Sequence, residues 1–206
     1  MSKENYIISS CVISNNIVIK NNERIFSGND DNLHSFLISV YHFIKTDYPK
    51  FYKMDNLSKL GWLASEILIK DESIIKQFQP GEIAVVLTNT NASLDADEKY
   101  FQSIKEIASP ALFVYTLPNI VIGEICIHNN FKGENSFFVF ENFNAAFIAQ
   151  YVNDLFSNNI VQICICGWVD VLEQNYKAAL FLISKNKEQD AMLFNEENLD
   201  KIFKSI

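Results

Sequence analysis

The sequence has few glycines, little positive charge and no long hydrophobic run. Its six glycines form no glycine-rich loop, and no linker, repeat or low-complexity segment interrupts the chain. No apolar stretch reaches the roughly 18 residues that a membrane span requires. The first residues, MSKENYIISSCVIS, lack the basic start and the apolar run of a secretory signal. We therefore expect no membrane span and no signal peptide.

Charge and composition restrict the class of protein further. Lys and Arg number 17 against 25 Asp and Glu, a net charge of −8, whereas nucleic-acid binders normally carry a basic surface. Hydrophobic residues make up 49% and aromatic residues 13%, with 17 Phe, which is more apolar surface than a disordered chain carries. We expect no nucleic-acid partner and one domain spanning residues 1–206 around an aromatic-rich core.

The cysteines indicate a reducing compartment. All four lie in apolar runs, at Cys11, Cys126, Cys164 and Cys166. Buried free thiols and a cytoplasmic location are the expected consequence. Cys164 and Cys166 alternate on a strand and so face the same side, but a lone C-x-C pair is weak evidence for a metal. We expect neither a metal nor a cofactor.

Apolar patterns alternate between strand and helix along the chain. The spacing of apolar residues and turn signals predicts strands at 5–13, 17–20, 82–89, 159–172 and 178–185. It predicts helices at 33–44, from the cap Asp55 onward, at 93–107 and at 195–205, with a polar loop at 21–32. Residues 109–147 read as a loop, a buried helix, a turn, a core strand and the sharp entry into a second buried helix. This alternation predicts an α/β fold.

Several short motifs stand in a fixed order along the chain: Tyr48 to Asp55 followed by LSKLGWLASEILI, then Ser109-Pro110, Phe113, Thr116, Pro118-Asn119, Gly123, Lys132-Gly133, Gly167 and Asp170. Together they resemble the N-terminal half of a β-ketoacyl synthase, of the thiolase-like superfamily. They cover residues 48–185. The resemblance implies a single thiolase-like half, with a mixed five-stranded sheet layered between helices.

The resemblance also implies a catalytic residue that this chain lacks. In the family, the strand after Lys132-Gly133 ends in a cysteine nucleophile at the start of a buried helix, where the helix dipole and backbone amides favour a thiolate and can hold an oxyanion. Counting from Gly133, that position falls on Asn142. A shift of one or two positions still gives no cysteine. We interpret Asn142 as the N-cap of the helix.

A second departure concerns the histidines of the family. The second half of a full synthase supplies two histidines that bind the malonyl carbonyl, and neither of their loops occurs here. His34, His42 and His128 are each expected to be ordinary, partly exposed residues. Glu124 and His128 lie four apart on one helical face, but two ligands do not make a metal site. Phe138 and Phe140, on one side of their strand, could fill the space that an acyl chain would need.

One binding feature of the family is retained. Residues 45–59 include four lysines (Lys45, Lys50, Lys53 and Lys59) and only two acidic residues, Asp47 and Asp55. Local positive charge attracts acidic partners, and basic residues just before Met-Asp help synthases to dock the acidic acyl carrier protein. The resemblance assigns that role to Lys53, with Lys50 as a weaker neighbour. A solvated lysine cluster without a role is the equal alternative.

Two hypotheses of function follow. The first is a non-catalytic partner, like the chain-length factors that pair with synthases, in fatty-acid or polyketide biosynthesis of the aryl-polyene or flexirubin type. Because a lone thiolase half exposes a sheet edge and an apolar face, it should pair with a synthase subunit or with itself. The second is an active malonyl-carrier decarboxylase, or an acyltransferase that uses Cys126.

Overall fold

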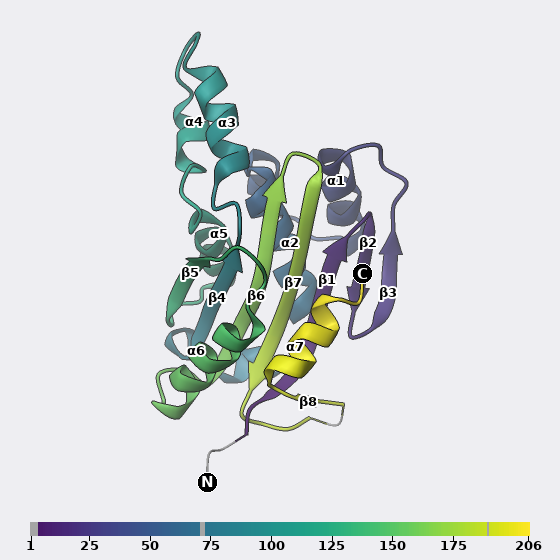
Figure 1. Ribbon diagram of the computed structural model, residues 1–206, viewed down its shortest axis with the longest axis vertical. Helices are drawn as coiled ribbons and strands as arrows, with labels where there is room; N and C mark the ends of the chain where they lie inside the picture. Colours follow the sequence, from purple (N-terminus) through teal and green to yellow (C-terminus); the bar gives the residue numbers. More distant parts are fainter. Residues whose placement is uncertain (1–3, 71–72, 189) are drawn as a thin grey trace.

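One mixed β-sheet organises the chain. The computed structural model describes residues 4–70, 73–188 and 190–206. Within them the strand order is β3-β2-β1-β7-β6-β4-β5, and β8 pairs with β1 (Figure 1). The strands are β1 (Tyr6–Ser14), β2 (Ile17–Lys20), β3 (Glu23–Ser27), β4 (Ile83–Asn89), β5 (Asn135–Val139), β6 (Ile163–Leu172), β7 (Asn175–Ser184) and β8 (Met192–Leu193). Among the strand pairs of the described residues, only β4–β5 and β4–β6 are parallel.

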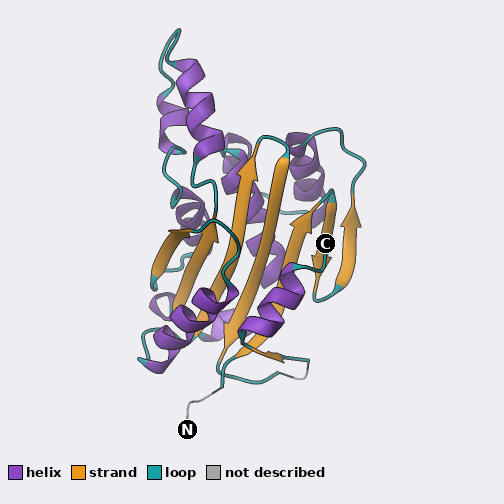
Figure 2. Cartoon of the chain, in the orientation of Figure 1, coloured by secondary structure: helices purple, strands orange, loops and turns teal. Residues whose placement is uncertain are grey.

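Helices cover both faces of this sheet, which gives three layers (Figure 2). The α-helices are α1 (Leu33–Ile44), α2 (Asn56–Ile69), α3 (Leu94–Ser103), α4 (Pro110–Val114), α5 (Ile120–Asn129), α6 (Ala145–Ser157) and α7 (Glu196–Phe203). Short 3-10 helices are η1 (Pro49–Lys53), η2 (Ser73–Gln77) and η3 (Pro80–Glu82). Helices α1, α2 and α5 pack on one face, and α6 and α7 on the other. The α3–α4 hairpin projects beyond the body as an arm.

Two hydrophobic clusters hold the layers together. On the face of α1, α2 and α5, alternate residues of the central strands, such as Val85, Leu87 and Ile165, meet Trp62 and Phe36. On the other face the intervening residues pack under α6 and α7. Because β4 is buried at all seven positions, its unbroken apolar run matches a strand covered on both sides.

The expected α/β class with a mixed sheet is confirmed, and several elements lie where the sequence predicts them. Helix α1 has the predicted bounds 33–44. Helix α2 begins after Asp55, whose side chain accepts a hydrogen bond from the Ser58 amide at 3.0 Å. Strand β2 has its predicted bounds, β1 and β4 differ from theirs by one residue, and β6 and β7 differ by up to four.

The sheet is wider than the five strands expected. Residues 21–32, predicted as a loop, contain β3. The turns before and after β2 are Asn15-Asn16 and Asn21-Asn22, and all four residues have positive φ, from 50° to 68°. Two residues in this left-handed region form the tight turn that suits hairpins, and asparagine tolerates it. The second Asn-Asn pair is therefore a hairpin turn that the polar composition concealed.

Two further expectations are wrong in detail. The helix predicted for 93–107 ends at Ser103, where the chain begins the tip of the arm. The strand at 135–139 was expected in the core, but β5 is an edge strand that pairs with β4 alone, and its residues are half-buried or exposed. Its three consecutive apolar residues resemble a core strand because both sides of an edge strand can carry apolar side chains.

Candidate functional site at the junction of β5 and α6

The loop between β5 and α6, residues 140–144, is fixed to the neighbouring strand. The Phe140 amide donates to the Asn89 carbonyl at 2.8 Å, and the Thr90 hydroxyl donates to the Glu141 carbonyl at 3.0 Å. Both Asn89 and Thr90 lie at the carboxyl end of β4. Ligands of open α/β sheets bind outside the carboxyl ends of the strands, so this junction occupies a position suited to chemistry.

Asp170 anchors the loop that follows β4. One of its carboxylate oxygens accepts from the amides of Thr90 and Asn91, at 3.1 and 3.0 Å, and the other accepts from the Asn91 side chain at 2.7 Å. Gly167, on the same strand, has φ of 145°, and a Cβ there would lie 2.0 Å from the Ala179 carbonyl oxygen. Gly167 and Asp170, two of the residues that carry the resemblance to the synthases, thus each have a clear structural role.

The helix cap is not the residue that the sequence predicted. Helix α6 begins at Ala145, and the Asn144 side chain accepts a hydrogen bond from the Phe147 amide at 2.9 Å. Asn142 lies two residues earlier, exposed in the loop. The interpretation of Asn142 as N-cap is therefore wrong, because the strand ends at Val139 and five residues separate it from the helix.

Aromatic rings fill the space on both sides of this loop. Phe143 stacks on Phe203 of α7, with ring centroids 4.0 Å apart and planes 6° apart. Phe138 and Phe140 both pack against Phe147, each with a centroid distance of 4.8 Å. The expected grouping of Phe138 and Phe140 on one side is seen. The junction is a packed aromatic cluster. The one ionisable side chain of residues 140–144 is that of Glu141, which is exposed to solvent, and these five residues include no basic residue and no cysteine.

Neither the loop between β5 and α6 nor α6 itself contains a cysteine. The sequence has no cysteine between Cys126 and Cys164. Cys126 lies on α5 and packs against the core on the face of α1 and α2, whereas α6 covers the other face. Burial raises the pKa of the Cys126 thiol to about 11. A thiol nucleophile needs its thiolate form, so Cys126 is poorly suited to accept an acyl group at neutral pH.

Glu124 and His128 do not share a site. Glu124 is buried and forms an ion pair with Lys50, at 2.6 Å, and its other oxygen accepts from the Tyr115 hydroxyl at 3.2 Å. His128 faces Glu66, with 3.4 Å between Nε2 and Oε2. Across the described residues, no group of three or more His, Cys, Asp or Glu side chains is arranged to hold a metal ion.

The lysine cluster is smaller than the sequence suggested. Lys53 is exposed at the end of η1, and Lys50 keeps 43% of its side chain exposed while it pairs with Glu124. Lys59 is only 4% exposed, and its ammonium lies 5.8 Å from the centre of the Phe51 ring. Burial lowers the pKa of Lys59. Lys59 is therefore not part of a docking surface, because its side chain points toward η1 and away from solvent.

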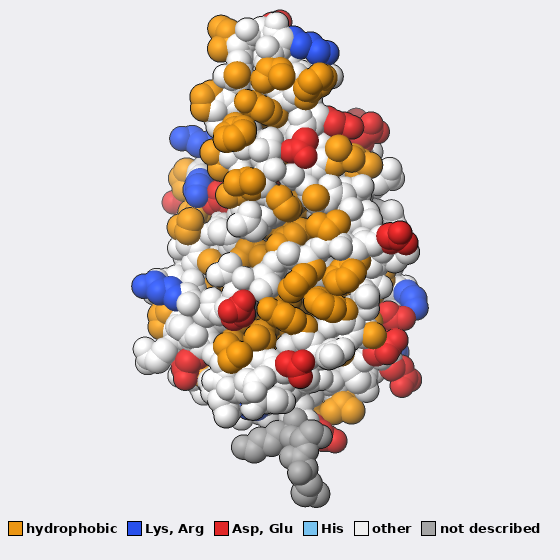
Figure 3. Space-filling model, turned by 60° about the vertical axis from the view of Figure 1, so that its left-hand side comes forward, with side chains coloured by type: hydrophobic (Ala, Val, Ile, Leu, Met, Phe, Trp, Pro, Cys, Tyr) orange, Lys and Arg blue, Asp and Glu red, His pale blue; other side chains and the backbone are white. Residues whose placement is uncertain are grey.

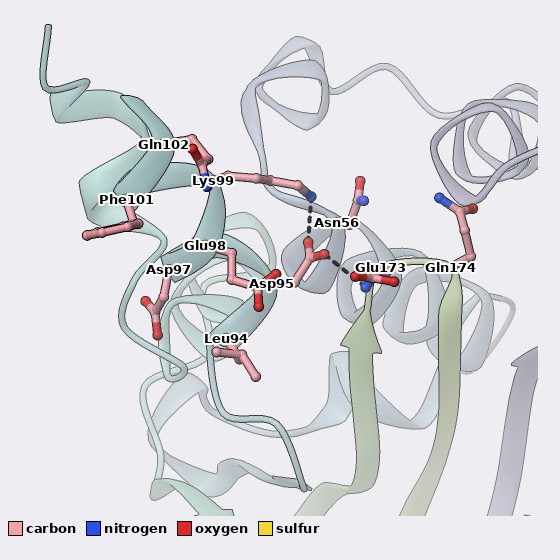
Figure 4. Close-up of a pocket in the computed structure, with 10 residues that line it drawn as sticks. All are labelled: Asn56, Leu94, Asp95, Asp97, Glu98, Lys99, Phe101, Gln102, Glu173 and Gln174. Atoms are coloured by element: carbon pink, nitrogen blue, oxygen red, sulfur yellow. Dashed lines mark hydrogen bonds and ion pairs between the residues drawn. The ribbon is translucent and has the colours of Figure 1, made fainter. Parts of the chain in front are cut away.

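An open hollow of about 780 Å³ lies between α3 and the β6–β7 turn, away from the junction (Figure 4). Its buried member, Asp95, pairs with Lys99 at 2.5 Å and accepts from the Glu173 amide at 3.1 Å. Because Asp95 and Glu173 are 78 positions apart in the chain, the bond between α3 and the β6–β7 turn depends on tertiary packing. Asp95 thus ties the base of the arm to the body.

Comparisons with solved structures show the fold. The ishigamide ketosynthase/chain length factor aligns with a TM-score of 0.63 and 15% identity, over 88% of this chain and 62% of that one. A ketosynthase in complex with its chain length factor from Xenorhabdus doucetiae aligns with a TM-score of 0.57 and 12% identity, over 89% and 79%. A β-ketoacyl synthase from Burkholderia phymatum STM815 gives 0.60 and 10%, over 89% and 59%. The expected thiolase-like, ketosynthase-type fold is confirmed.

The chain spans less than two thirds of the first of these structures. No protein-family model matches the sequence, and no curated sequence is significantly similar to it. None of the described helices is long and apolar enough to cross a lipid bilayer.

Proposed function

We propose that this protein is a non-catalytic condensing-enzyme-like subunit, a single thiolase-like domain that pairs with a ketosynthase-type chain or with its own copy. The observation that carries the proposal is the junction of β5 and α6. Its backbone is held by hydrogen bonds to the Asn89 carbonyl and from the Thr90 hydroxyl, yet the position assigned to the nucleophile is Asn142. A shift in that assignment to the helix cap gives Asn144, which also cannot form a thioester.

The solved relatives support a partner role. One of them is a ketosynthase in complex with its chain length factor, and another is a type II PKS acyl-carrier protein in complex with its ketosynthase bound to the hexaketide. The latter aligns with a TM-score of 0.58 and 14% identity, over 89% of this chain and 64% of that one. By analogy of fold, we assign this chain to fatty-acid or polyketide biosynthesis, with a role like that of a chain length factor.

The pathway and compartment are part of the same proposal. The short synthase-like form of the sequence resembles proteins of aryl-polyene and flexirubin-type pigment pathways, and we place this chain in such a pathway. Three of its four free cysteines are fully buried, as expected for a protein of the reducing cytoplasm.

Lys53 supports binding of an acyl carrier protein. It is exposed, and it stands next to Met54 at the end of η1. Lys50 is a weaker contributor than the sequence suggests, because its ammonium already compensates the buried carboxylate of Glu124. A docked acidic carrier would have to share Lys50 with that carboxylate.

The active-enzyme alternative has less support. It requires a nucleophile such as Cys126, but that thiol has a raised pKa and packs on the face of the sheet opposite α6. Acyl transfer also needs an oxyanion site beside the nucleophile, and Cys126 lies in the last turn of α5, away from any helix N-terminus.

Two measurements on the purified protein test the proposal together. The protein is mixed with a ketosynthase encoded beside it, and the mass of the mixture is measured in solution. In parallel, it is incubated with malonyl- and acyl-carrier protein, and intact mass reports any acyl adduct. We expect a stable complex and no adduct. An acyl-enzyme burst, or release of carbon dioxide from malonyl-carrier by the protein alone, would favour the enzyme instead.

A further inference from the structure

We propose that the hollow between α3 and the β6–β7 turn is a docking site for a basic, partly apolar segment of a different protein. The inference goes beyond the proposed function, since it involves neither the junction of β5 and α6 nor the exposed Lys53. It names a second interaction surface, whose charge is opposite to that of the lysines of η1.

Carboxylates dominate the walls of the hollow. Its ionisable lining residues are Asp95, Asp97, Glu98, Lys99 and Glu173. Asp95 and Lys99 neutralise each other at 2.5 Å, which leaves three carboxylates. The side chains of Glu98 and Glu173 are exposed, and neither forms an ion pair within the part of the chain that the structure describes. Such a concentration of uncompensated negative charge attracts a cationic partner.

Two apolar side chains share the hollow with these carboxylates. Leu94 is 41% exposed and Phe101 is 58% exposed, and because they lie seven positions apart on α3 they share one side of the helix. The face of the Phe101 ring already accepts one ammonium, that of Lys105, at 5.7 Å from the ring centre. Figure 3 shows hydrophobic side chains over the arm, with acidic side chains near its base. The occupant therefore needs apolar surface as well as positive charge.

The two walls of the hollow are fixed before anything binds. Asp95 of α3 accepts from the Glu173 amide at 3.1 Å, which joins one wall to the other (Figure 4). The Gln174 side chain accepts from the Leu33 amide at 2.9 Å, which joins the β6–β7 turn to the start of α1. A preformed surface loses little conformational entropy when a partner is bound.

Glu173 occupies a backbone position that suits other residue types better. It has φ of 55° in the tight turn between β6 and β7. Among the described residues, nine other than glycine have positive φ; six of these are asparagine, and Glu173 is the one acidic residue. Asparagine adopts this left-handed region at a lower cost than glutamate. A glutamate held there against its backbone preference indicates a use for its charge.

A basic segment of a different protein fits these features better than other ligands do. No group of three or more His, Cys, Asp or Glu side chains among the described residues is arranged to hold a metal ion. A second copy, with a net charge of −8, does not suit an acidic hollow, and nucleic acids are repelled by it. A small polyamine would leave Leu94 and Phe101 in water. A segment that carries lysine or arginine beside apolar residues satisfies both parts of the surface.

Three labelled synthetic peptides test the site on the intact protein by fluorescence anisotropy. The first has lysine and leucine at the spacing of an amphipathic helix. The second replaces each lysine by glutamate, and the third replaces each leucine by serine. We expect the lysine-leucine peptide alone to bind with about micromolar affinity at low salt. Its binding should weaken about tenfold at high salt, because exposed charges are screened.

Charge variants locate the binding site. Glu98→Gln/Glu173→Gln should weaken binding of the lysine-leucine peptide about tenfold. The matched control Glu106→Gln/Glu188→Gln makes the same change of net charge at exposed positions outside the lining of the hollow, and it should change the affinity by less than about twofold. Phe101→Ser should weaken binding severalfold through the loss of its apolar contact.

One further variant separates binding from folding. Glu173→Asn removes the charge but suits a φ of 55°. We expect it to weaken peptide binding while its melting temperature equals or exceeds that of the wild type. Weaker binding in a variant of equal or greater stability assigns the effect to the lost carboxylate and not to damage to the fold.

Any of four results would overturn the inference. Equal losses in the hollow variant and its matched control would mean that only net charge matters. Equal binding of the glutamate-leucine peptide would reduce the site to apolar contact, and equal binding of the lysine-serine peptide would reduce it to a site for simple cations. A wild type that binds none of the peptides has no such site. The proposed function stands or falls separately, on the ketosynthase complex and the absent acyl adduct.

Discussion

The ammonium of Lys50 lies 2.6 Å from the Glu124 carboxylate, and the two side chains are 43% and 5% exposed. The pair joins η1 to α5. It also means that a lysine predicted to bind a carrier protein first serves the stability of its own chain.

Removing Lys50 should therefore destabilise the protein. Lys50→Ala leaves a buried carboxylate without its counter-ion, and we expect a loss of about 1–2 kcal/mol, less than for a fully buried pair because Lys50 is partly solvated. The double variant Lys50→Ala/Glu124→Gln should recover most of that loss. Urea denaturation measures both. Equal stability of the single and double variants would show that Glu124 does not need Lys50.

Carrier binding should depend on Lys53 more than on Lys50. Lys53→Glu is expected to weaken the complex with acyl carrier protein several-fold at low salt, with a smaller effect at high salt, because exposed charges are screened. Lys201→Glu on α7 is a control with the same change of net charge. Isothermal titration at two salt concentrations gives the comparison. If the two variants bind alike, only net charge matters and Lys53 is not a docking residue.

Asn142 and Asn144, two positions apart in the loop between β5 and α6, should respond differently to replacement by alanine. Asn144→Ala removes the cap of α6 and should cost about 1 kcal/mol. Asn142→Ala, in the exposed loop, should be neutral within about 0.5 kcal/mol. Thermal or urea unfolding distinguishes them. If Asn142→Ala lost more stability than Asn144→Ala, Asn142 would be the helix cap, as the sequence predicted.

Cys126 should react slowly with alkylating reagents at neutral pH. With a pKa of about 11, roughly one thiol in 3,000 is ionised at pH 7.5. Iodoacetamide labelling, followed by peptide mass spectrometry, should therefore accelerate steadily from pH 7.5 to above pH 10. A plateau near pH 8 would indicate an activated thiol and would revive the acyltransferase alternative.

The buried thiol of Cys11 should make the protein less stable in alkali. Burial raises its pKa from 9.0 to about 12. Between these values the unfolded chain has lost the thiol proton while the folded chain keeps it, so the free energy of unfolding falls as pH rises through this window. The slope is up to about 1.4 kcal/mol per pH unit for one such group. Cys11→Ala should flatten this limb of the stability curve, whatever its cost at neutral pH.

Local patterns in the sequence determined much of the fold. Helix α1 and the Asp55 cap of α2 follow from apolar spacing and from a side chain that bonds to an amide three residues away. The buried strand β4 follows from its unbroken apolar run. In each case neighbours in the chain supply the interaction, so the sequence carries the signal. The missing thiol between Cys126 and Cys164 is likewise a fact of the sequence.

Other features depend on residues far apart in the chain. Lys50 pairs with Glu124, and Asp170 holds the loop after β4; each of these contacts joins residues 74 or more positions apart. The burial of Lys59 requires α2 to be packed on its neighbours. The edge position of β5 depends on which strand lies beside β4. The sequence by itself determined the elements and the absent nucleophile. Only the tertiary structure decided which lysines are free, which asparagine caps α6 and which edge stays open, because those properties belong to contacts between elements and not to any one of them.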